Sequence, residues 1–120
     1  MKHTVATLEG ALLDAAVAKA EGLPVHPGRG DWIVADSLDT VYADEKAFSR
    51  VWAYGGPIIE RERISTNPAE GADDQGSPGW KGWASYPSEP AIGPMYGPTM
   101  LISAMRAFVF SRLGEDVELP

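Results

Sequence analysis

The sequence predicts an α+β fold in which two main helices pack on a small, mostly antiparallel sheet with many loops. Residues 8–21 and 99–113 have apolar residues at the spacing of a helix, and the residues at the ends of these segments are of the types that begin or end helices. Shorter runs alternate apolar and polar residues, as strands do. The 13 glycines and 10 prolines among 120 residues indicate much loop around a modest core. This length suits one domain, so we expect residues 1–120 to form a single domain.

The first helix is predicted by residues 8–21, which read LEGALLDAAVAKAE. Alanine is the best helix former, and it alternates here with Leu12, Leu13 and Val17 on a wide apolar face. Gly22 follows where helices commonly end. The small alanines would let this helix approach a neighbouring element closely, so we expect it to lie in the core.

The region after this helix is ambiguous. Prolines and glycines predict a loop over 23–31, and the apolar residues 32–34 favour a short strand. Residues 44–52 favour one or two helical turns, with Phe48, Val51 and Trp52 facing inward. The triplet at 55–57, Gly-Gly-Pro, is expected to break the chain.

A run of alternating charges follows, within residues 58–65 (IIERERIS), which have the period of a strand. Glu60 and Glu62 would lie on one face, and Arg61 and Arg63 on the other. Charges on both faces exclude a central strand and favour a solvated edge strand that resists pairing with another sheet. A charged binding surface is the second interpretation.

Acid/base chemistry by the two glutamates is the third interpretation. On a strand, Glu60 and Glu62 would lie about 6.5–7 Å apart, which suits the carboxylate pair of an inverting hydrolase. The alternating arginines weigh against this interpretation, because nothing in the sequence raises the pKa of either carboxyl group. A small hydrolase or ligand-binding enzyme using this pair is therefore the alternative function.

Other strands are expected at 80–86, which alternates, at 115–119 and, near the amino terminus, at 4–7. Glycine, proline and polar residues dominate 66–79 and 88–98. We expect both of these segments to be loops.

The clearest helix is predicted over 99–113. Thr99 can cap its amino end, and Gly114 ends it. Its core face is formed by Leu101, Ile102, Met105, Phe108, Val109 and Leu113. Phe110 projects to the opposite side and must be covered, either by the loop 88–98 or by a second copy of the chain. The loop is the favoured cover, so we expect a monomer, with a homodimer as the alternative.

Charge and composition narrow the partners. A net charge of −7 disfavours binding to a phosphate backbone. A weaker hypothesis is that the protein contacts nucleic acid through a patch formed by Arg61, Arg63, Arg106 and Arg112. The chain has no cysteine, which excludes disulfides and thiolate chemistry and suits a reducing cytoplasm. No apolar run is long enough for a membrane span, and the first residues do not read as a signal peptide.

No metal, cofactor or catalytic group is expected. The two histidines, His3 and His26, lack the spacing of metal ligands, and no nucleophile motif accompanies them. The aspartates between residues 36 and 44 lack the spacing of a calcium loop. Trp83 and Tyr86 lie between two predicted loops, where aromatic residues either fill the core or bind a partner. The candidate binding residues are therefore Glu60, Arg61, Glu62, Arg63, Trp83, Tyr86 and Phe110.

Three segments resemble the phage NinX-like proteins, a small family of bacteriophages and prophages. They are LEGALLDAAVAKAEG (8–22), GGPIIERERIS (55–65) and GPTMLISAMRAFVFSRLGEDVELP (97–120), which with the region of Trp80 cover a little over half of the chain. Ala15 and Phe108 depart from the family pattern, in which a larger aromatic residue and a cysteine are common, and both are differences of packing.

This resemblance implies an origin in a phage or prophage, and a location in the cytoplasm of the bacterial host. It brings no established activity with it. Together with the small size and the absence of catalytic motifs, it leads us to expect a non-catalytic accessory protein that binds a host or phage protein.

Overall fold

The computed structural model describes residues 2–23, 25–27, 32–36, 39–42, 48–71, 80–88 and 93–119. In this part of the chain lie three α-helices, α1 (Gly10–Ala20), α2 (Trp52–Glu62) and α3 (Met100–Leu113), and the short 3₁₀ helix η1 (Val5–Thr7). The strands are β1 (Lys2–Thr4), β2 (Val25–Pro27), β3 (Trp32–Asp36), β4 (Asp39–Tyr42), β5 (Ser65–Gly71), β6 (Trp80–Tyr86), β7 (Met95–Gly97) and β8 (Asp116–Glu118). The α+β class predicted from the sequence is confirmed.

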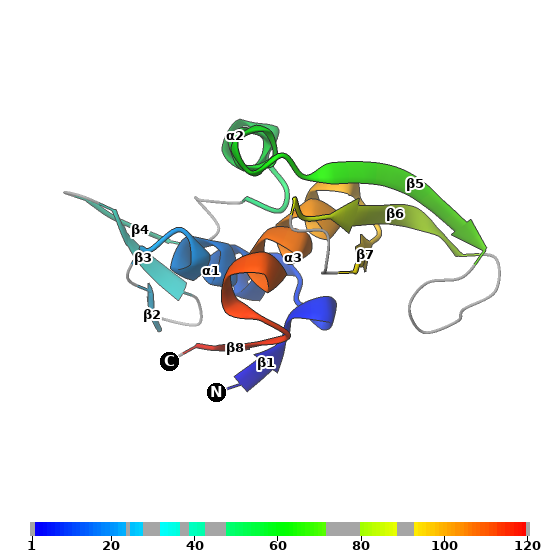
Figure 1. Cartoon of the computed structure of the whole chain (residues 1–120). Helices are drawn as coiled ribbons and strands as arrows, with labels where there is room; N and C mark the ends of the chain where they lie inside the picture. The colour runs from blue at the N-terminus through cyan, green and yellow to red at the C-terminus, as the bar shows by residue number, and fades with distance from the viewer. Residues whose placement is uncertain are drawn as a thin grey trace.

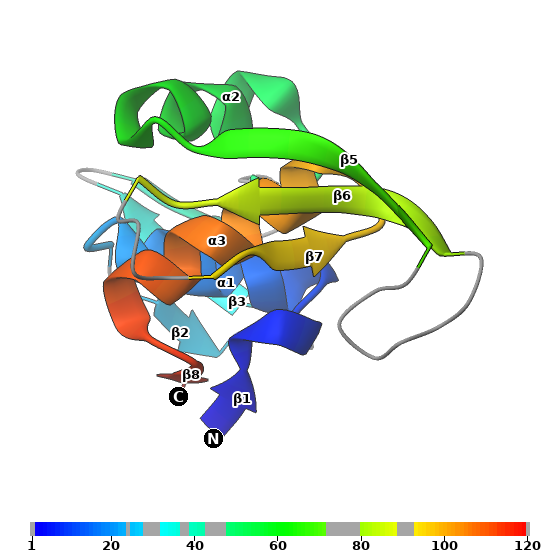
Figure 2. The ribbon, with the colours of Figure 1, turned by 45° about the vertical axis from the view of Figure 1, so that its right-hand side comes forward.

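The strands form three small antiparallel sheets. β1 pairs with β8, β2–β3–β4 form a second sheet, and β5–β6–β7 form a third. Helix α3 lies at the centre, between α1 on one side and the sheet β5–β6–β7 on the other, with α2 beside that sheet (Figures 1 and 2). The sheet β2–β3–β4 packs against α1, and the hairpin of β5 and β6 extends past the amino end of α3 (Figure 2).

The core forms where α1 and α3 meet. Leu13 and Val17 of α1, and Met105 and Phe108 of α3, are fully buried. The alanines of α1 are also buried, which allows the two helices to approach closely, as their small side chains predict. Burial of this apolar surface is the main stabilising contribution to the fold.

Both predicted helices end as their sequences indicate. The Thr99 hydroxyl group accepts a hydrogen bond from the Ile102 N–H at 3.1 Å, which caps α3. Gly22 and Gly114 have φ angles of 87° and 89°, a left-handed conformation that favours glycine. The strands predicted at 80–86 and 115–119 are confirmed as β6 and β8, and the one predicted at 32–34 lies within β3.

The strand predicted at 58–65 is wrong, because residues up to Glu62 belong to α2 and β5 begins at Ser65. Gly55, Ile58, Ile59 and Glu62 have the helical spacing i, i+3, i+4 and i+7, and Ile58 is buried. The alternation of charges imitated a strand because the run is too short to separate the two periods. The chain break expected at 55–57 is also wrong, since all three residues are helical.

Four other boundaries differ from the prediction. Residues 25–27 form β2, within the segment 23–31 that was expected to be a loop. Residues 66–71 of β5 and residues 95–97, which form β7, lie in the two later segments that were also expected to be loops. β5 pairs only with β6, so it lies at a sheet edge, where Pro68 is tolerated. The first strand is β1, at Lys2–Thr4, and the rest of the predicted strand 4–7 is the helix η1. The remainders of both predicted loops, 72–79 and 89–92, lie outside the described residues, as do 43–47, where part of the predicted helical turns falls.

Candidate functional site

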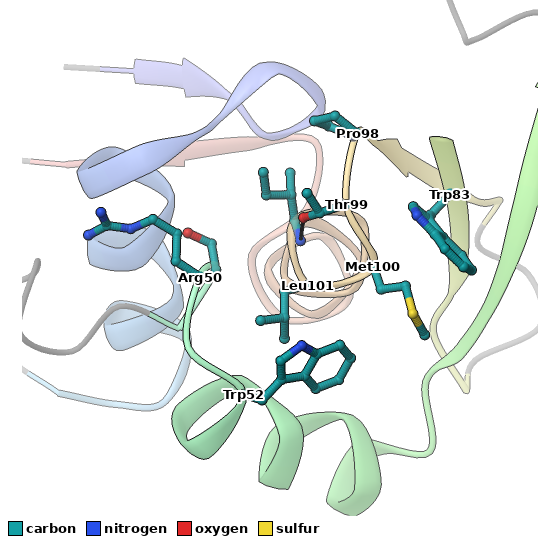
Figure 3. Close-up of a pocket in the computed structure, with 9 residues that line it drawn as sticks. Arg50, Trp52, Trp83, Pro98, Thr99, Met100 and Leu101 are labelled. Carbon is teal, nitrogen blue, oxygen red and sulfur yellow. Dashed lines mark hydrogen bonds between the residues drawn. The ribbon is translucent and has the colours of Figure 1, made fainter. Parts of the chain in front are cut away.

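A cavity lies over the amino end of α3 in the described part of the chain, and we call it the α3 groove (Figure 3). Its volume is about 480 Å³. It is bordered by the turn at 48–50, the start of α2, strand β6 and the first turn of α3. Nine residues line it: Ser49, Arg50, Trp52, Trp83, Pro98, Thr99, Met100, Leu101 and Ile102.

One wall of the groove is fixed by a buried carboxylate. Asp14 of α1 is fully buried, and one of its oxygens accepts a hydrogen bond from the Ser49 N–H at 2.8 Å. A hydrogen bond from a backbone N–H to a buried charged acceptor is stronger than one between neutral groups. Asp14 therefore holds the turn at 48–50, and with it Arg50 and the start of α2, against α1.

Two glycines allow the elements around the groove to approach each other closely. A Cβ atom on Gly55 would lie 2.4 Å from the Phe48 carbonyl oxygen and 2.7 Å from a Leu101 methyl group. A Cβ atom on Gly97 would lie 2.6 Å from the Ser103 backbone nitrogen. Real Cβ atoms essentially never approach so closely, so α2 and β7 can occupy their positions only with glycine at these two sites.

A chain of buried hydroxyl groups joins the sheet to the first turn of α3. The Ser103 hydroxyl donates to the Met100 carbonyl oxygen at 3.0 Å and lies 2.7 Å from the Ser85 hydroxyl. The Ser85 hydroxyl lies 2.9 Å from that of Thr66. Since Ser103 gives its one proton to Met100, Ser85 donates to Ser103 and Thr66 donates to Ser85. This chain links β5, β6 and α3 and positions the groove.

The surface of the groove is mainly apolar. Figure 3 views α3 along its axis, with Trp52 next to Leu101 and with Met100 extending between Trp52 and Trp83. The Trp52 side chain is 52% exposed, which is the highest value among the large hydrophobic residues that the structure describes. Arg50 is exposed on the side of α3 opposite Trp83, and it is the only ionisable residue among the nine that line the groove. The groove therefore suits an apolar ligand, and its described lining contains no carboxylate or imidazole for acid/base chemistry.

The predicted charged residues lie elsewhere, at the carboxyl ends of the helices. Arg61 of α2 forms ion pairs with Glu21, which follows α1, and with Glu62, and Glu62 also accepts a hydrogen bond from Arg112 of α3 at 2.8 Å. The guanidinium groups of Arg61 and Arg112 lie 5.7 and 5.3 Å from the centre of the buried Phe108 ring. The charged run therefore joins three helices over a core aromatic residue.

The glutamate pair does not have the geometry that the hydrolase hypothesis assumed. Glu60 and Glu62 lie two positions apart on a helix, about 200° around its axis, so they do not share a face. The hydrogen bonds from Arg112 and then Arg61 hold the pKa of Glu62 below its usual range, whereas a general acid needs a raised value. Neither glutamate lines the α3 groove. Glu60 is exposed, and so is Arg63, whose φ of 53° ends α2 in a left-handed conformation.

The four arginines proposed for nucleic acid do not form one patch. Arg106 is buried, and its guanidinium group donates to the carbonyl oxygens of Leu8 and Tyr96 at 2.8 and 2.7 Å. Arg61 and Arg112 are engaged by carboxylates. Arg106 therefore has a structural function, which is to hold the start of α1 and strand β7 against α3.

The three aromatic residues predicted to bind a partner lie in three different parts of the structure. Trp83 is partly buried and lines the α3 groove, whereas Tyr86, farther along the same strand, is 43% exposed and does not line it. Phe110 is partly buried and borders a second cavity of about 360 Å³. Met95, which belongs to the segment expected to cover Phe110, borders that cavity too. The alternative cover, a second copy of the chain, stays a prediction.

Sequence reasoning missed most of the groove. Phe48, Val51 and Trp52 were expected to face inward, and Phe48 is buried. Val51 and Trp52 lie at the start of α2, where both are exposed. Arg50 and Met100 carried no signal, because their importance comes from the meeting of three distant segments. A sequence signal for Trp52 would have been available only if the start of α2 had been recognised.

Neither a metal site nor a membrane-spanning helix is found among the described residues. Among the described residues, no group of three or more histidine, aspartate or glutamate side chains could hold a metal ion. In the same part of the chain, no helix has the length and apolar character that crossing a membrane requires.

The fold and the groove define a small α+β protein built around one central helix, with an apolar groove at the amino end of that helix. The family described as "Bacteriophage P22, NinX" matches residues 4–112, so the chain belongs to this family of phage proteins. The resemblance found in the sequence is thereby confirmed. None of the curated proteins matches the chain.

Proposed function

We propose that this phage protein is a non-catalytic accessory protein that binds a host or phage protein through the α3 groove. The exposed indole of Trp52 at the edge of an apolar groove is the observation that carries the proposal. Tryptophan is enriched among the residues that contribute most to binding at protein interfaces. The bacterial cytoplasm, where such partners would be met, is the proposed location.

The lining of the groove favours binding over catalysis. The ionisable side chain in its described lining is that of Arg50, and a guanidinium group is a poor general acid or base. Trp52, Trp83 and Met100 come from three different elements, so folding assembles the apolar surface before a partner arrives. A preformed surface lowers the entropic cost of binding.

The test is affinity capture from phage-infected cells, followed by measurement with the purified partner. Wild-type protein should retain one specific partner, and Trp52→Ala should lose it, with a fall in affinity of about 10-fold or more in calorimetry. Tyr86→Ala removes an aromatic ring of similar exposure outside the groove and should bind like wild type. Circular dichroism would confirm that both variants are folded. A partner that binds Trp52→Ala and wild type equally would refute the proposal.

A further inference from the structure

We infer that the α3 groove recognises an acidic, apolar peptide segment, in which an Asp or Glu side chain lies next to a large apolar side chain. This inference rests on the proposed function and names the chemistry of the partner. Three observations support it: the charge of the groove, the open amide groups of α3 and a buried hydroxyl group without a partner.

Among the described residues, the lining of the groove carries a positive charge in a protein that is acidic overall. The net charge of the chain is −7, yet the one ionisable side chain in this described lining is that of Arg50. Its guanidinium group makes no ion pair with the described residues, in contrast to Arg61 and Arg112. An unpaired cation on the rim of an apolar groove complements a carboxylate and repels a basic segment.

The amino end of α3 opens into the same groove. The N–H groups of Ile102 and Ser103 donate to the side chain and backbone of Thr99, whereas those of Met100 and Leu101 find no acceptor among the described residues. Free N–H groups and the helix dipole favour an anion at this position. Both Met100 and Leu101 line the groove, so a carboxylate placed there would also bring its neighbour to the tryptophans.

The third observation is Ser49, a lining residue that is only 2% exposed. Its hydroxyl group has no hydrogen-bond partner among the described residues, which is uncommon for a buried polar atom. The hydroxyl group can reach a new acceptor by rotating about one bond. A carboxylate in the groove would supply that acceptor, and an apolar ligand alone would not.

The apolar half of the segment has its own place. Met100 and Trp83 lie on the side of the α3 axis away from Arg50, and Trp52 lies below the axis, between these two sides (Figure 3). The charged and apolar parts of the ligand would therefore contact different sides of the helix end. The cavity of about 480 Å³ has room for both side chains. Specificity would then require both features close together in one segment.

The first test is selection of short random displayed peptides on the immobilised full chain, with a parallel selection on Trp52→Ala. The inference expects sequences enriched on wild type alone, in which an Asp or Glu lies within a few positions of a large apolar residue. Enrichment of basic peptides, or of apolar peptides without an acidic residue, would overturn it.

The second test measures fluorescence anisotropy with the most enriched peptide. Arg50→Gln should weaken binding roughly 3- to 10-fold, and replacing the peptide's acidic residue by its amide should weaken it similarly. The loss of affinity when both changes are made should be smaller than the product of the two separate fold-losses, because both changes remove the same interaction. Lys2→Gln is the matched control, since it removes one positive charge from β1, which lies beyond the far end of α3, and it should bind like wild type.

Two outcomes separate this inference from the proposed function. Peptides that require Trp52 but bind equally with an acid or an amide would overturn the acidic specificity and leave the groove as a binding site. Peptides that bind wild type and Trp52→Ala equally would overturn both. The groove could recognise the terminal carboxylate of a peptide instead of an internal Asp or Glu, and amidating the carboxyl end of the peptide tests this. If amidation of the end abolishes binding while the internal acidic residue is intact, recognition of an internal acidic residue is overturned.

Discussion

The two ends of α3 differ in whether their charged and polar groups have partners within the described part of the protein. At the carboxyl end, Arg61 and Arg112 lie over the Phe108 ring, and Glu21 and Glu62 neutralise them. At the amino end, the side chains form an apolar groove with an exposed tryptophan. Among the described residues, Arg50 has no ion-pair partner there, and the N–H groups of Met100 and Leu101 have no acceptor. The charged side chains at the carboxyl end join three helices, so few of them are available to a ligand. The groups at the amino end remain available to a ligand.

This contrast teaches that a dense cluster of charges need not be a functional site. The run Glu60–Arg63 is the most conspicuous polar feature of the sequence, yet two of its residues serve the packing of helices. The described lining of the groove contains a single charged residue, Arg50, and the groove is recognisable only in three dimensions. Unsatisfied groups, rather than abundant ones, mark the candidate site.

The largest expected effect is at the carboxyl end of α3. Phe108→Ala should lower the free energy of unfolding by about 3–5 kcal/mol, because it removes a fully buried ring and leaves a cavity beneath two guanidinium groups. Urea denaturation followed by circular dichroism measures the change. Phe108→Leu keeps most of the volume and should cost about 1–2 kcal/mol. Equal stabilities of the alanine variant and wild type would show that this end does not depend on the ring.

The second prediction concerns the amino end, where two adjacent glycines should respond in opposite directions. Gly55→Ala should destabilise the protein by about 1–3 kcal/mol, because its methyl group would overlap the Phe48 carbonyl oxygen. Gly56→Ala meets its nearest atom, on the Trp52 ring, at 3.7 Å and should stabilise α2 by up to about 1 kcal/mol. Thermal unfolding of the two variants compares them directly. The close approach of α2 would be refuted if both substitutions were stabilising.

The third prediction concerns the buried hydroxyl chain. Ser103→Ala should cost about 1–3 kcal/mol, because the Ser85 hydroxyl group loses its acceptor in a dry interior. Adding Ser85→Ala should cost less than the sum of the single changes. Ser111→Ala removes a hydroxyl group that bonds only its own helix, so it should change stability by less than about 0.5 kcal/mol. Additive losses in chemical denaturation would contradict a connected chain.

The smallest effect is expected for the ion pairs of Glu62. Its pKa is lowered in the folded state, so its stabilising contribution is present above the unfolded value and is lost as the pH falls through the folded one. Glu62→Gln should lower stability by about 0.3–1 kcal/mol at neutral pH. The difference from wild type should shrink below about pH 4, as measured by denaturation over a pH series. A difference that stays constant across the series would mean that the carboxylate charge contributes nothing.

Local signals allowed α1 and α3 to be predicted, because both helices are long and have recognisable ends at Gly22, Thr99 and Gly114. Helix α2 could not be predicted, since its residues at 55–57 resemble a break. Gly55 is present for close packing and not for a turn, and Pro57 is tolerated on the exposed side of α2. These reasons depend on neighbours that are distant in the sequence.

The same limit applies to the candidate site. Trp83 was identified because an aromatic residue between loops is conspicuous, and β6 was predicted at its observed bounds. Trp52 and Arg50 could not be identified, because their exposure depends on the position of α2 relative to α3. Strand β7 has only three residues, and its pairing with β6 is set by the position of Gly97 against α3.

The pairing of β1 with β8 has a consequence for the order in which the protein folds. Lys2 lies opposite Glu118, so β1 has no strand partner until β8 has been synthesised. Arg106 likewise bonds to the Leu8 carbonyl oxygen, 98 positions earlier in the chain. Contacts between such distant positions slow folding, because a long loop must close before they form. On the ribosome, α1 would therefore wait with its apolar face uncovered until α3 emerges, and this interval is when the nascent chain is most exposed to chaperones and proteases.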